Sequence, residues 1–302
     1  MSVPVFDIDV GWTGTPTTPA FGTGSYDDIT AETKSVSISR GRSNDMSTID
    51  QGQCTIRLSD FAGKFNPENA SSVLAANLVP MKAIRIRAVF ATVTYGLFYG
   101  FISRIEYDPT AREAIIQGVD LFEWLNKTYP TIASMASKSP DYIIGQILDA
   151  INWTDAGLRS LGVSADTVPT WSADGTKSAL TLIQELLTVE RGIFFINGSG
   201  VATFLTRAVH YANGNVAATF TPMPGDMRTS VEKDRIINSQ KVTRTGGVEQ
   251  SVTDATSRTN FGYRDGSAIS SAYLASDGGA LQLANFIVAM NKDPRSPSRQ
   301  VG

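Results

Sequence analysis

The chain has 302 residues, 42% of them hydrophobic and 18% charged, which is enough to bury a sizeable core. This length is typical of two domains, although large β proteins often use it for one. With 26 Lys and Arg against 29 Asp and Glu, the net charge is −3. The charge balance therefore disfavours a protein whose main role is tight, sequence-independent binding of nucleic acid.

Cysteine content and hydropathy exclude further classes. Cys54 is the single cysteine, so the chain can form neither an intramolecular disulfide nor a thiolate zinc site of its own. It shares a strand face with Ile56 and Leu58, and we expect a buried apolar residue there. The first residues lack a basic segment followed by an apolar one, and no run of about eighteen apolar residues occurs. We expect a protein made in a cytoplasm, neither secreted nor embedded in a membrane.

Residues 1–125 predict an N-terminal β domain. Apolar side chains recur there with a period close to two, and Gly, Pro, Asn and Asp turns separate the runs. The apolar positions are Val36, Ile38, Cys54, Ile56, Leu58, Ile84, Ile86, Ala88, Phe90, Leu97, Tyr99, Phe101, Ala114 and Ile116. Several short strands of this kind indicate a β-barrel or sandwich. Residues 95–102 are apolar on both faces, so we expect one face to meet the core and the other to meet a neighbouring domain or subunit.

Residues 126–212 predict a middle domain of α and β structure. Ser139 followed by Pro140 is typical of a helix start, and the spacing of apolar residues predicts a helix up to residue 151. A second helix is predicted over residues 176–191, with Gly192 as its stop. Two strand-like runs on either side of Asn197-Gly198 predict a β-hairpin over residues 193–205. Both helices are amphipathic, so we expect them to pack on a sheet.

Residues 213–302 predict a second β domain with a C-terminal helix. Strands are expected at residues 217–221 and 236–243, and residues 245–247 read as a turn. The last helix is predicted over residues 277–291, with Leu281, Ala284, Ile287 and Val288 on one apolar stripe. The whole sequence therefore predicts a mainly β fold with α+β insertions.

The sequence contains no pattern typical of a catalytic, metal-binding or cofactor-binding site. His210 is the single histidine, and without a second His or a nearby Cys it forms neither a metal site nor an evident Ser-His-Asp set. No pair of acidic residues has a spacing that singles it out for glycoside hydrolysis. No Gly-x-Gly-x-x-Gly or Walker pattern joins a strand to a helix, so the glycines are expected to serve turns and bulges. We expect a protein that is not an enzyme and needs no cofactor or metal.

Arginines recur at strand positions or strand ends of the N-terminal domain. They are Arg40, Arg42, Arg57, Arg85, Arg87 and Arg104. Arg85 and Arg87 alternate with Ile84 and Ile86, so they share the face opposite the core.

Two interpretations of these arginines stay open. In the first, they lie on a solvated face and pair with carboxylates such as Asp45, Asp50 or Glu106. In the second, all of them except Arg57 lie at a subunit interface or at the lumen of a ring, where Arg can bind a neighbour's carboxylate through two parallel hydrogen bonds.

Several short motifs follow one another along most of the chain. They include Ser-Arg-Gly-Arg at 39–42, Phe-Asn-Pro at 65–67, residues 179–187 leading into Gly-Ile-Phe-Phe at 192–195, Asp-Arg-Ile-Ile-Asn at 234–238, Thr-Asn-Phe-Gly at 259–262 and Asn-Lys-Asp-Pro-Arg at 291–295. In this order they resemble the tail hub, or minor tail, proteins of long-tailed bacteriophages, a baseplate-hub-like family.

The resemblance implies a structural protein at the tip of a phage tail. Such hubs are typically trimers whose tail-tube-like β-barrel domains form a pseudo-sixfold ring around the DNA channel. The implied partners are further copies of the chain, the tail tube or distal tail protein, the tape measure protein and other tail-tip proteins, while DNA passes without specific binding. The implied location is the virion tail, assembled in the cytoplasm of the host bacterium.

Members of this family continue past the Asp-Pro-Arg segment into further strands. We therefore expect the last segment of this sequence, residues 295–302, to pair with another chain that completes the C-terminal domain.

Two other functions remain as alternatives. A hexameric distal tail ring protein fits the same sequence, because symmetry is a property of the interface. A carbohydrate-binding adhesin is a more distant alternative, since four Trp and nine Tyr supply groups that could stack on sugars. Trp124, Trp153 and Trp171 lie in or beside apolar runs, however, and we expect them in the core. An exposed aromatic cleft would favour the adhesin.

Overall fold

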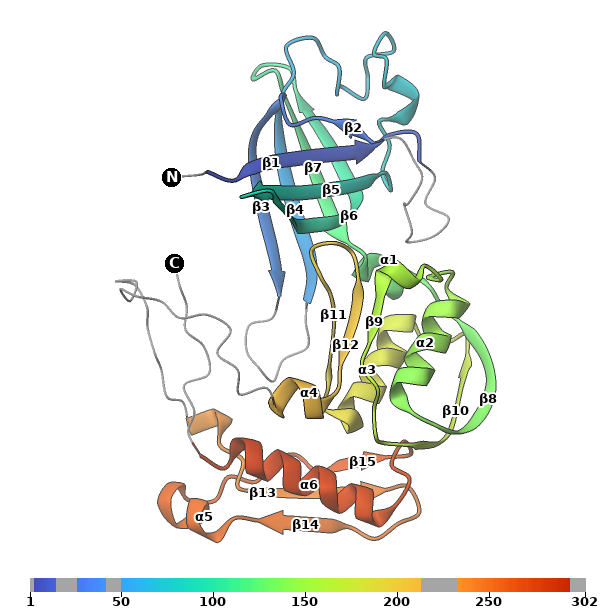
Figure 1. The fold of residues 1–302 in the computed structure, drawn as a ribbon, viewed down its shortest axis with the longest axis vertical. Helices are drawn as coiled ribbons and strands as arrows, with labels where there is room; N and C mark the ends of the chain where they lie inside the picture. Colours follow the sequence, from blue (N-terminus) through green and yellow to red (C-terminus); the bar gives the residue numbers. More distant parts are fainter. Residues whose placement is uncertain (1–2, 15–25, 42–49, 213–232, 294–302) are drawn as a thin grey trace.

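The computed structural model describes residues 3–14, 26–41, 50–212 and 233–293, except the side chains of Asp50 and of residues 210–212. Figure 1 shows three parts that follow one another along the longest axis of the molecule. We refer to them as the first lobe (residues 3–120), the middle lobe (121–212) and the third lobe (233–293). Together they form a mixed α/β fold that is rich in strands.

The first lobe is built on a sheet of seven antiparallel strands. Their order is β2-β1-β5-β6-β7-β4-β3. The elements are β1 (Val5–Gly11), β2 (Asp27–Asp28), β3 (Thr33–Gly41), β4 (Asp50–Ser59), the short 3-10 helix η1 (Ala75–Asn77), β5 (Ala83–Phe90), β6 (Val93–Asp108) and β7 (Glu113–Asp120).

Alternation of apolar and polar residues explains these strands. In β5, Ile84 and Ile86 are fully buried, and the polar positions between and beyond them face outward. Cys54 is 3% exposed in the same core, which confirms its prediction as a buried residue, and burial raises the pKa of its thiol to about 12. Phe90 was expected on the buried face but is 43% exposed, because the β5–β6 hairpin extends past the core.

Two register shifts bend the long strand β6. One lies in its pairing with β5 near Ile86, and the other in its pairing with β7 near Ile102. An extra residue on one strand bends the strand and increases its twist. In Figure 1, β1 and β5 consequently cross over β3, β4 and β7, and the first hydrophobic cluster lies between the two halves of the sheet.

The expected closure into a β-barrel is not found among the described residues. The strand ladder ends at β2 on one side and at β3 on the other. The chain passes directly from one edge to the other through residues 29–32, where Ile29 N donates to Ile8 O and Ser59 N donates to Glu32 O. Strand β2 has only two residues and pairs with β1, so β2 and β3 remain the two edges of the sheet.

The middle lobe combines four α-helices with two short sheets. Its elements are α1 (Phe122–Lys127), β8 (Thr131–Lys138), α2 (Pro140–Ala150), the 3-10 helix η2 (Ala156–Leu158), β9 (Arg159–Leu161), β10 (Val168–Asp174), α3 (Ala179–Glu190), β11 (Ile193–Ile196), β12 (Ala202–Leu205) and α4 (Arg207–Ala212). Strands β10 and β8 form one antiparallel pair. Strands β11, β12 and β9 form a second sheet, in which β12 and β9 run parallel.

Both predicted helices and the predicted hairpin of the middle lobe are confirmed. Helix α2 begins at Pro140, although Ser139 makes no capping hydrogen bond through its side chain. Helix α3 is capped by Ser178, whose Oγ accepts from Thr181 N at 3.2 Å. It ends at Glu190, because Arg191 adopts a left-handed conformation with φ of +54°.

The third lobe packs one long helix on a three-stranded sheet. Its elements are the 3-10 helix η3 (Lys233–Arg235), β13 (Ser239–Arg244), β14 (Gln250–Thr253), α5 (Ala255–Phe261), β15 (Ile269–Ser271) and α6 (Asp277–Asn291). The strand order is β14-β13-β15, and α6 lies along this sheet (Figure 1). Helix α6 has the bounds that the sequence predicts, but Leu281 was wrongly placed on its buried stripe and is 39% exposed. The buried positions are Ala280, Leu283, Ala284, Ile287 and Val288.

Some expectations fall outside the described residues. The strand predicted at residues 217–221 and the pairing predicted for residues 295–302 both do. The domain boundaries at residues 125 and 212 also stay predictions.

The three hydrophobic clusters share elements. Strand β6 supplies Phe98 and Ile102 to the first cluster, and Tyr99 and Phe101 to the cluster of the middle lobe. This confirms that the two faces of this strand meet different cores. Helix α3 likewise packs Leu186 in the middle lobe and Val189 in the cluster of the third lobe.

Candidate functional site

The predicted arginines direct attention to the outer face of β1 and β5. Arg85 lies opposite Asp9 in the strand register, and Arg87 lies opposite Asp7. Arg85 Nε donates to Asp9 Oδ2 at 3.0 Å. Arg87 Nη2 donates to Asp7 Oδ2 at 2.5 Å and to Asp9 Oδ2 at 2.7 Å. The four side chains form a cross-strand network in which two positive charges balance two negative ones.

Burial makes Asp9 the centre of this network. Its side chain is 7% exposed, whereas the side chains of Arg85 and Arg87 are 31% and 29% exposed. A buried carboxylate is stable only when it is paired and hydrogen-bonded. Burial and the adjacent Asp9 raise the pKa of the Asp7 carboxyl, against the opposing effect of Arg87. The pair Asp7 and Asp9 thus depends on the two arginines for its charge balance.

One oxygen of each of Asp7, Asp9 and Asp28 lies within 4.8 Å of the others. A hydroxyl and a backbone hydrogen bond from Thr30 lower the pKa of Asp28. Because Arg85 and Arg87 already neutralise Asp7 and Asp9, the cluster is an ion-pair network, and we assign no metal to it.

Aromatic rings extend the network toward the middle lobe. The Arg85 guanidinium carbon lies 4.2 Å from the centroid of the Tyr26 ring. Tyr26 forms a side-chain hydrogen bond with Tyr99, which lies opposite Arg85 on β6. Burial raises the pKa of the Tyr26 phenol, while Tyr99 and Arg85 act in the other direction. Since Tyr99 belongs to the middle-lobe cluster, the outer face of β5 and β6 is continuous with the junction between the two lobes.

Arg40 lies at that junction. It stands near the end of β3, and its Nη1 donates to Leu97 O on β6 at 2.5 Å. Its Nη2 lies 3.5 Å from Ile196 O on β11, a strand of the middle lobe. Burial lowers the pKa of the guanidinium, and the nearby Asp120 opposes this effect. Arg40 therefore bridges two lobes of the same chain.

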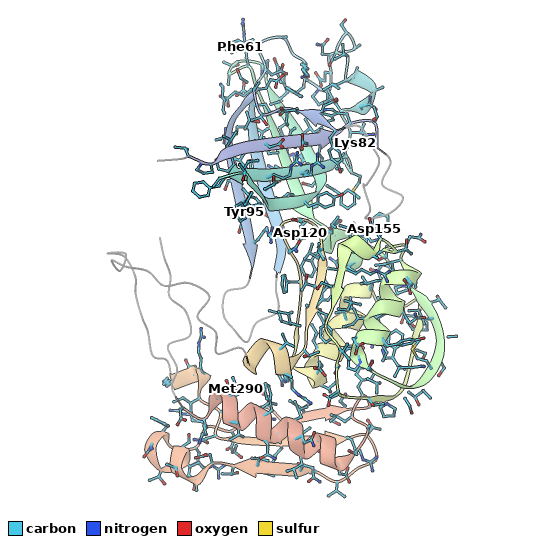
Figure 2. All side chains as sticks on the ribbon, viewed as in Figure 1. Phe61, Lys82, Tyr95, Asp120, Asp155 and Met290 are labelled. Atoms are coloured by element: carbon cyan, nitrogen blue, oxygen red, sulfur yellow. The ribbon has the colours of Figure 1, made fainter. Side chains whose placement is uncertain are left out.

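Asp120 also lies at this junction, where it links β4 to the start of α1. Its Oδ2 accepts from Gly52 N at 2.8 Å, and its Oδ1 accepts from Phe122 N at 3.0 Å. Figure 2 shows Asp120 where the first sheet meets α1. Burial raises the pKa of this carboxyl to about 6, although both backbone hydrogen bonds and Arg40 oppose the shift.

Glycines allow the hairpin of the middle lobe to touch β6. A Cβ at Gly96 would lie 2.2 Å from Ser199 Oγ, and a Cβ at Gly200 would lie 2.4 Å from the Tyr99 ring. Gly200 also has φ of +82°. The turn between β11 and β12 is therefore seated against the first sheet by backbone contact, with Asn197 Oδ1 accepting from Ser199 N and Val201 N.

The remaining arginines are exposed or not described. Arg104 pairs with Glu106 and is 64% exposed, and Arg57 lies 3.7 Å from Glu113 and is 52% exposed. Arg42 and Asp45 lie outside the described residues, as does the side chain of Asp50.

The two interpretations of the arginines can now be compared. The first interpretation held that the arginines pair with carboxylates of the same chain. Arg85 and Arg87 do so. Their partners are Asp9 and Asp7 on β1, which were not among the examples named from the sequence. Glu106 is the partner of Arg104, as expected. A role of these arginines at a subunit interface or a lumen stays a prediction.

An uncovered apolar group lies at the hairpin end of this sheet. We call it the apolar end, and it consists of Val5, Phe6, Phe90, Val93 and Tyr95, all between 43% and 67% exposed. The register of β1, β5 and β6 places these residues at the same end of the sheet, with Phe6 and Tyr95 on either side of Ala88 and with Val5 on the opposite face from Phe6. Figure 2 shows Tyr95 at this end and Phe61 at the opposite end of the lobe.

The tryptophans do not form a binding surface. Trp12, Trp153 and Trp171 are at most 3% exposed. Trp124 is partly buried, stacks on Phe101 with centroids 6.1 Å apart, and donates from Nε1 to Ile151 O at 3.0 Å. The prediction that they are core residues is confirmed. His210 belongs to α4, and its side chain lies outside the described residues.

Sequence reasoning missed the acidic members of the site. None of Asp7, Asp9 and Asp120 was singled out from the sequence. A signal for the first pair was present, because two Asp two residues apart in one strand match two Arg two residues apart in another. For Asp120 the sequence carried no such signal.

Comparisons with solved structures identify the fold. The 43 kDa tail protein of prophage MuSo2 from Shewanella oneidensis matches with a TM-score of 0.54 and 12% identity, over 95% of this chain and 76% of that one. A tail protein from Neisseria meningitidis MC58 matches with a TM-score of 0.54 and 10% identity, over 93% and 74% of the two chains. Prophage tail protein gp18 from Listeria monocytogenes EGD-e matches with a TM-score of 0.54 and 11% identity, over 92% and 76%. The chain therefore shares the fold of these tail proteins.

Sequence comparisons add no relative. No protein-family model and no curated protein matches the chain. Among the described residues, no helix combines the length and the apolar character needed to cross a membrane.

Proposed function

We propose that this chain is a structural protein of a phage or prophage tail, and that it forms a homotrimeric hub ring around the DNA channel at the tail tip. The observation that carries the proposal is the likeness of nearly the whole chain, all three lobes included, to three solved tail proteins. The role proposed is assembly, without catalysis and without a cofactor.

The surface of the first lobe supports a role in assembly. The apolar end leaves two Val, two Phe and one Tyr side chains in contact with water. Exposed apolar residues gathered at one end of a sheet are typical of protein–protein contacts. On the outer face of β1 and β5, Arg85 and Arg87 are paired with Asp7 and Asp9, and Asp28 lies beside them, so this face offers no strongly positive surface to DNA.

The partners proposed are neighbouring copies of the chain, the tail tube or distal tail protein, the tape measure protein and other proteins of the tail tip. The location proposed is the virion tail, with assembly in the bacterial cytoplasm. The buried positions of the tryptophans support this role over a sugar-binding adhesin, which would need exposed stacking rings.

Measurement of the native mass tests the proposal. Light scattering coupled to size exclusion, together with class averages from electron microscopy, should give three copies around a central channel. Six copies in a ring would replace the hub with a hexameric distal tail ring. A monomer that binds glycans would overturn both and favour the adhesin.

A further inference from the structure

Three of the short motifs named in the sequence meet at one corner of the third lobe. Asn238 belongs to the first, and its Nδ2 donates at 2.8 Å to the carbonyl oxygen of Gly262 in the second. In the third, the carbonyl oxygen of Asn291 accepts from Ile237 N at 3.0 Å. All three motifs therefore lie beside the segment that follows α5. We call this segment, residues 262–267, the contact loop.

Two buried amide side chains hold the contact loop. Asn238 is fully buried, and its Oδ1 accepts from Arg264 N at 3.0 Å while its backbone N donates to Arg264 O at 2.8 Å. Gln240 is 2% exposed, and its Nε2 donates to Ser267 O at 2.7 Å. Buried polar side chains whose hydrogen bonds are made rigidify the segment that they hold. The contact loop is therefore fixed near both of its ends.

The contact loop exposes a large aromatic side chain. Tyr263 lies between Gly262 and Arg264, which are both bonded to the clamp, yet it is 80% exposed. The Arg258 guanidinium carbon lies 4.7 Å from the centroid of the Tyr263 ring, and Arg258 Nη2 donates to Asp265 Oδ1 at 2.6 Å. The ring is thus supported from its own chain, and most of it remains in water. A side chain presented on a rigid segment loses less conformational entropy on binding than one on a mobile segment.

The next residue, Arg264, has a guanidinium without a counter-ion. Its side chain is partly buried, and its Nε is shielded from water and makes no hydrogen bond. No carboxylate of the described residues pairs with it, and two acidic side chains of this corner, Asp265 and Asp254, already pair with Arg258 and Lys292. A guanidinium binds a carboxylate through two parallel hydrogen bonds. The missing partner is therefore a carboxylate that comes from another chain.

We propose that the contact loop is an interaction surface for an acidic segment of a neighbouring protein subunit in the tail. A carboxylate of that segment binds the Arg264 guanidinium, and the residues around the carboxylate pack on the Tyr263 ring. Tyr and Arg are among the residues that most often carry the binding energy of protein interfaces. The charge of the corner does not favour nucleic acid, because Arg258 is already neutralised by Asp265.

This surface is separate from the apolar end. Figure 1 shows α5, which leads into the contact loop, at the end of the molecule opposite the first lobe. The contact loop therefore binds a different neighbour from the one that covers the apolar end. The inference rests on the proposed function, because it requires the chain to be part of a tail.

Cross-linking of the full chain in purified tail particles tests for the carboxylate. In Arg264→Lys an amine replaces the guanidinium, and a water-soluble carbodiimide joins this amine to a carboxylate in contact with it as an amide, taking up the water that is released. We expect a link from position 264 to an Asp or Glu of a neighbouring subunit in the particle, and no such link in the free chain. The control Arg258→Lys should give a link to Asp265 of the same chain in both states.

Incorporation into the particle tests whether the contact matters for assembly. Arg264→Glu reverses the charge and Tyr263→Ser removes the ring, and each should lower incorporation by about tenfold, the effect of losing a residue that carries binding energy. Val248→Ser, at a position of the same lobe that is 68% exposed, should be incorporated normally. Thermal unfolding of the free chain should be similar for all three variants, which separates a lost contact from a lost fold.

The outcomes distinguish this inference from the proposed function. The inference alone is overturned if position 264 links to no neighbouring subunit while the Arg258→Lys control reacts, or if Arg264→Glu and Tyr263→Ser are incorporated like the natural protein. Tail particles that lack the chain altogether would remove the proposed function, and this inference with it.

Discussion

Gly96 and Gly198 pack backbone against backbone where the first and middle lobes meet. A Cβ on Gly198 would lie 2.0 Å from Gly96 O and 2.9 Å from Arg40 Nη1. No real side chain fits in that space, so the position of the hairpin on β6 depends on the absence of two side chains.

Gly198→Ala should push the β11–β12 turn away from β6. It should destabilise the protein by about 1–3 kcal/mol, the usual effect of overpacking. Thermal unfolding measures the change. The matched control is Gly145→Ala within α2, where a Cβ would make an ordinary contact of 3.8 Å with Leu161. That variant should be neutral or stabilising by up to about 1 kcal/mol, because Ala favours a helix. Equal effects of the two substitutions would contradict the proposed crowding.

The pair Arg85 and Asp9 should be coupled in stability. Arg85→Ser leaves a buried carboxylate with one partner fewer, whereas Arg85→Ser combined with Asp9→Asn removes the charge as well. A double-mutant cycle on the free energy of unfolding should give about 1–2 kcal/mol of coupling. Arg104→Ser, at a position 64% exposed, should change stability by less than about 0.5 kcal/mol. Additive effects of Arg85→Ser and Asp9→Asn would rule out the network.

The β5–β6 hairpin has a strained turn. Ala91 and Thr92 have φ of +47° and +71°, values that favour Asn and Gly at the two central positions of such turns. Ala91→Asn with Thr92→Gly should stabilise the protein by about 1–2 kcal/mol, since each left-handed L-residue costs roughly 1 kcal/mol. An unchanged melting temperature would show that the turn is not strained.

Asp120 should make the junction between the first and middle lobes sensitive to pH. Its folded pKa of about 6 lies above the ordinary value of 3.8. The folded form therefore binds more protons between these values, and stability falls by about 2–3 kcal/mol as pH rises from about 4 to 6, then stays constant. Denaturant unfolding at several pH values measures this, and Asp120→Asn should remove the slope. A slope that persists in Asp120→Asn belongs to another group.

The apolar end should matter for assembly. If the ring forms, Tyr95→Ser should lower the fraction of assembled protein while the melting temperature of the monomer stays within a few degrees, because Tyr95 is 50% exposed. Phe61→Ser, at an exposed aromatic residue at the other end of the lobe, serves as the control and should assemble normally. Normal assembly of Tyr95→Ser would exclude this surface as a contact.

The spacing of apolar residues along the sequence predicted the helices and strands that bury one face and expose the other. Helix α6 and the hairpin of β11 and β12 are examples, since a 3.6-residue period or an Asn-Gly turn is complete within a short segment. Strand β8 was missed because none of its eight residues is buried, which leaves no alternation of apolar and polar residues in the sequence.

Non-local relationships could not be predicted in the same way. Asp9 and Arg85 are 76 residues apart, and only the register of β1 on β5 brings them together. The raised pKa of Asp120 also arises from burial that the sequence around this residue does not determine. The open edges of the first sheet also depend on which strands pair, which the pattern within any one strand does not determine.

Strand β6 has a consequence for how this protein can be divided. Its outward side chains Tyr99 and Phe101 are 9% and 0% exposed, and both are covered by residues beyond position 120. A fragment cut near residue 120 would lose Trp124, which stacks on Phe101, and would leave both rings partly uncovered and prone to aggregation. During synthesis, the first lobe leaves the ribosome before the residues that cover Tyr99 and Phe101. The outer side of β6 is therefore fully buried only after the chain up to β12 has been made.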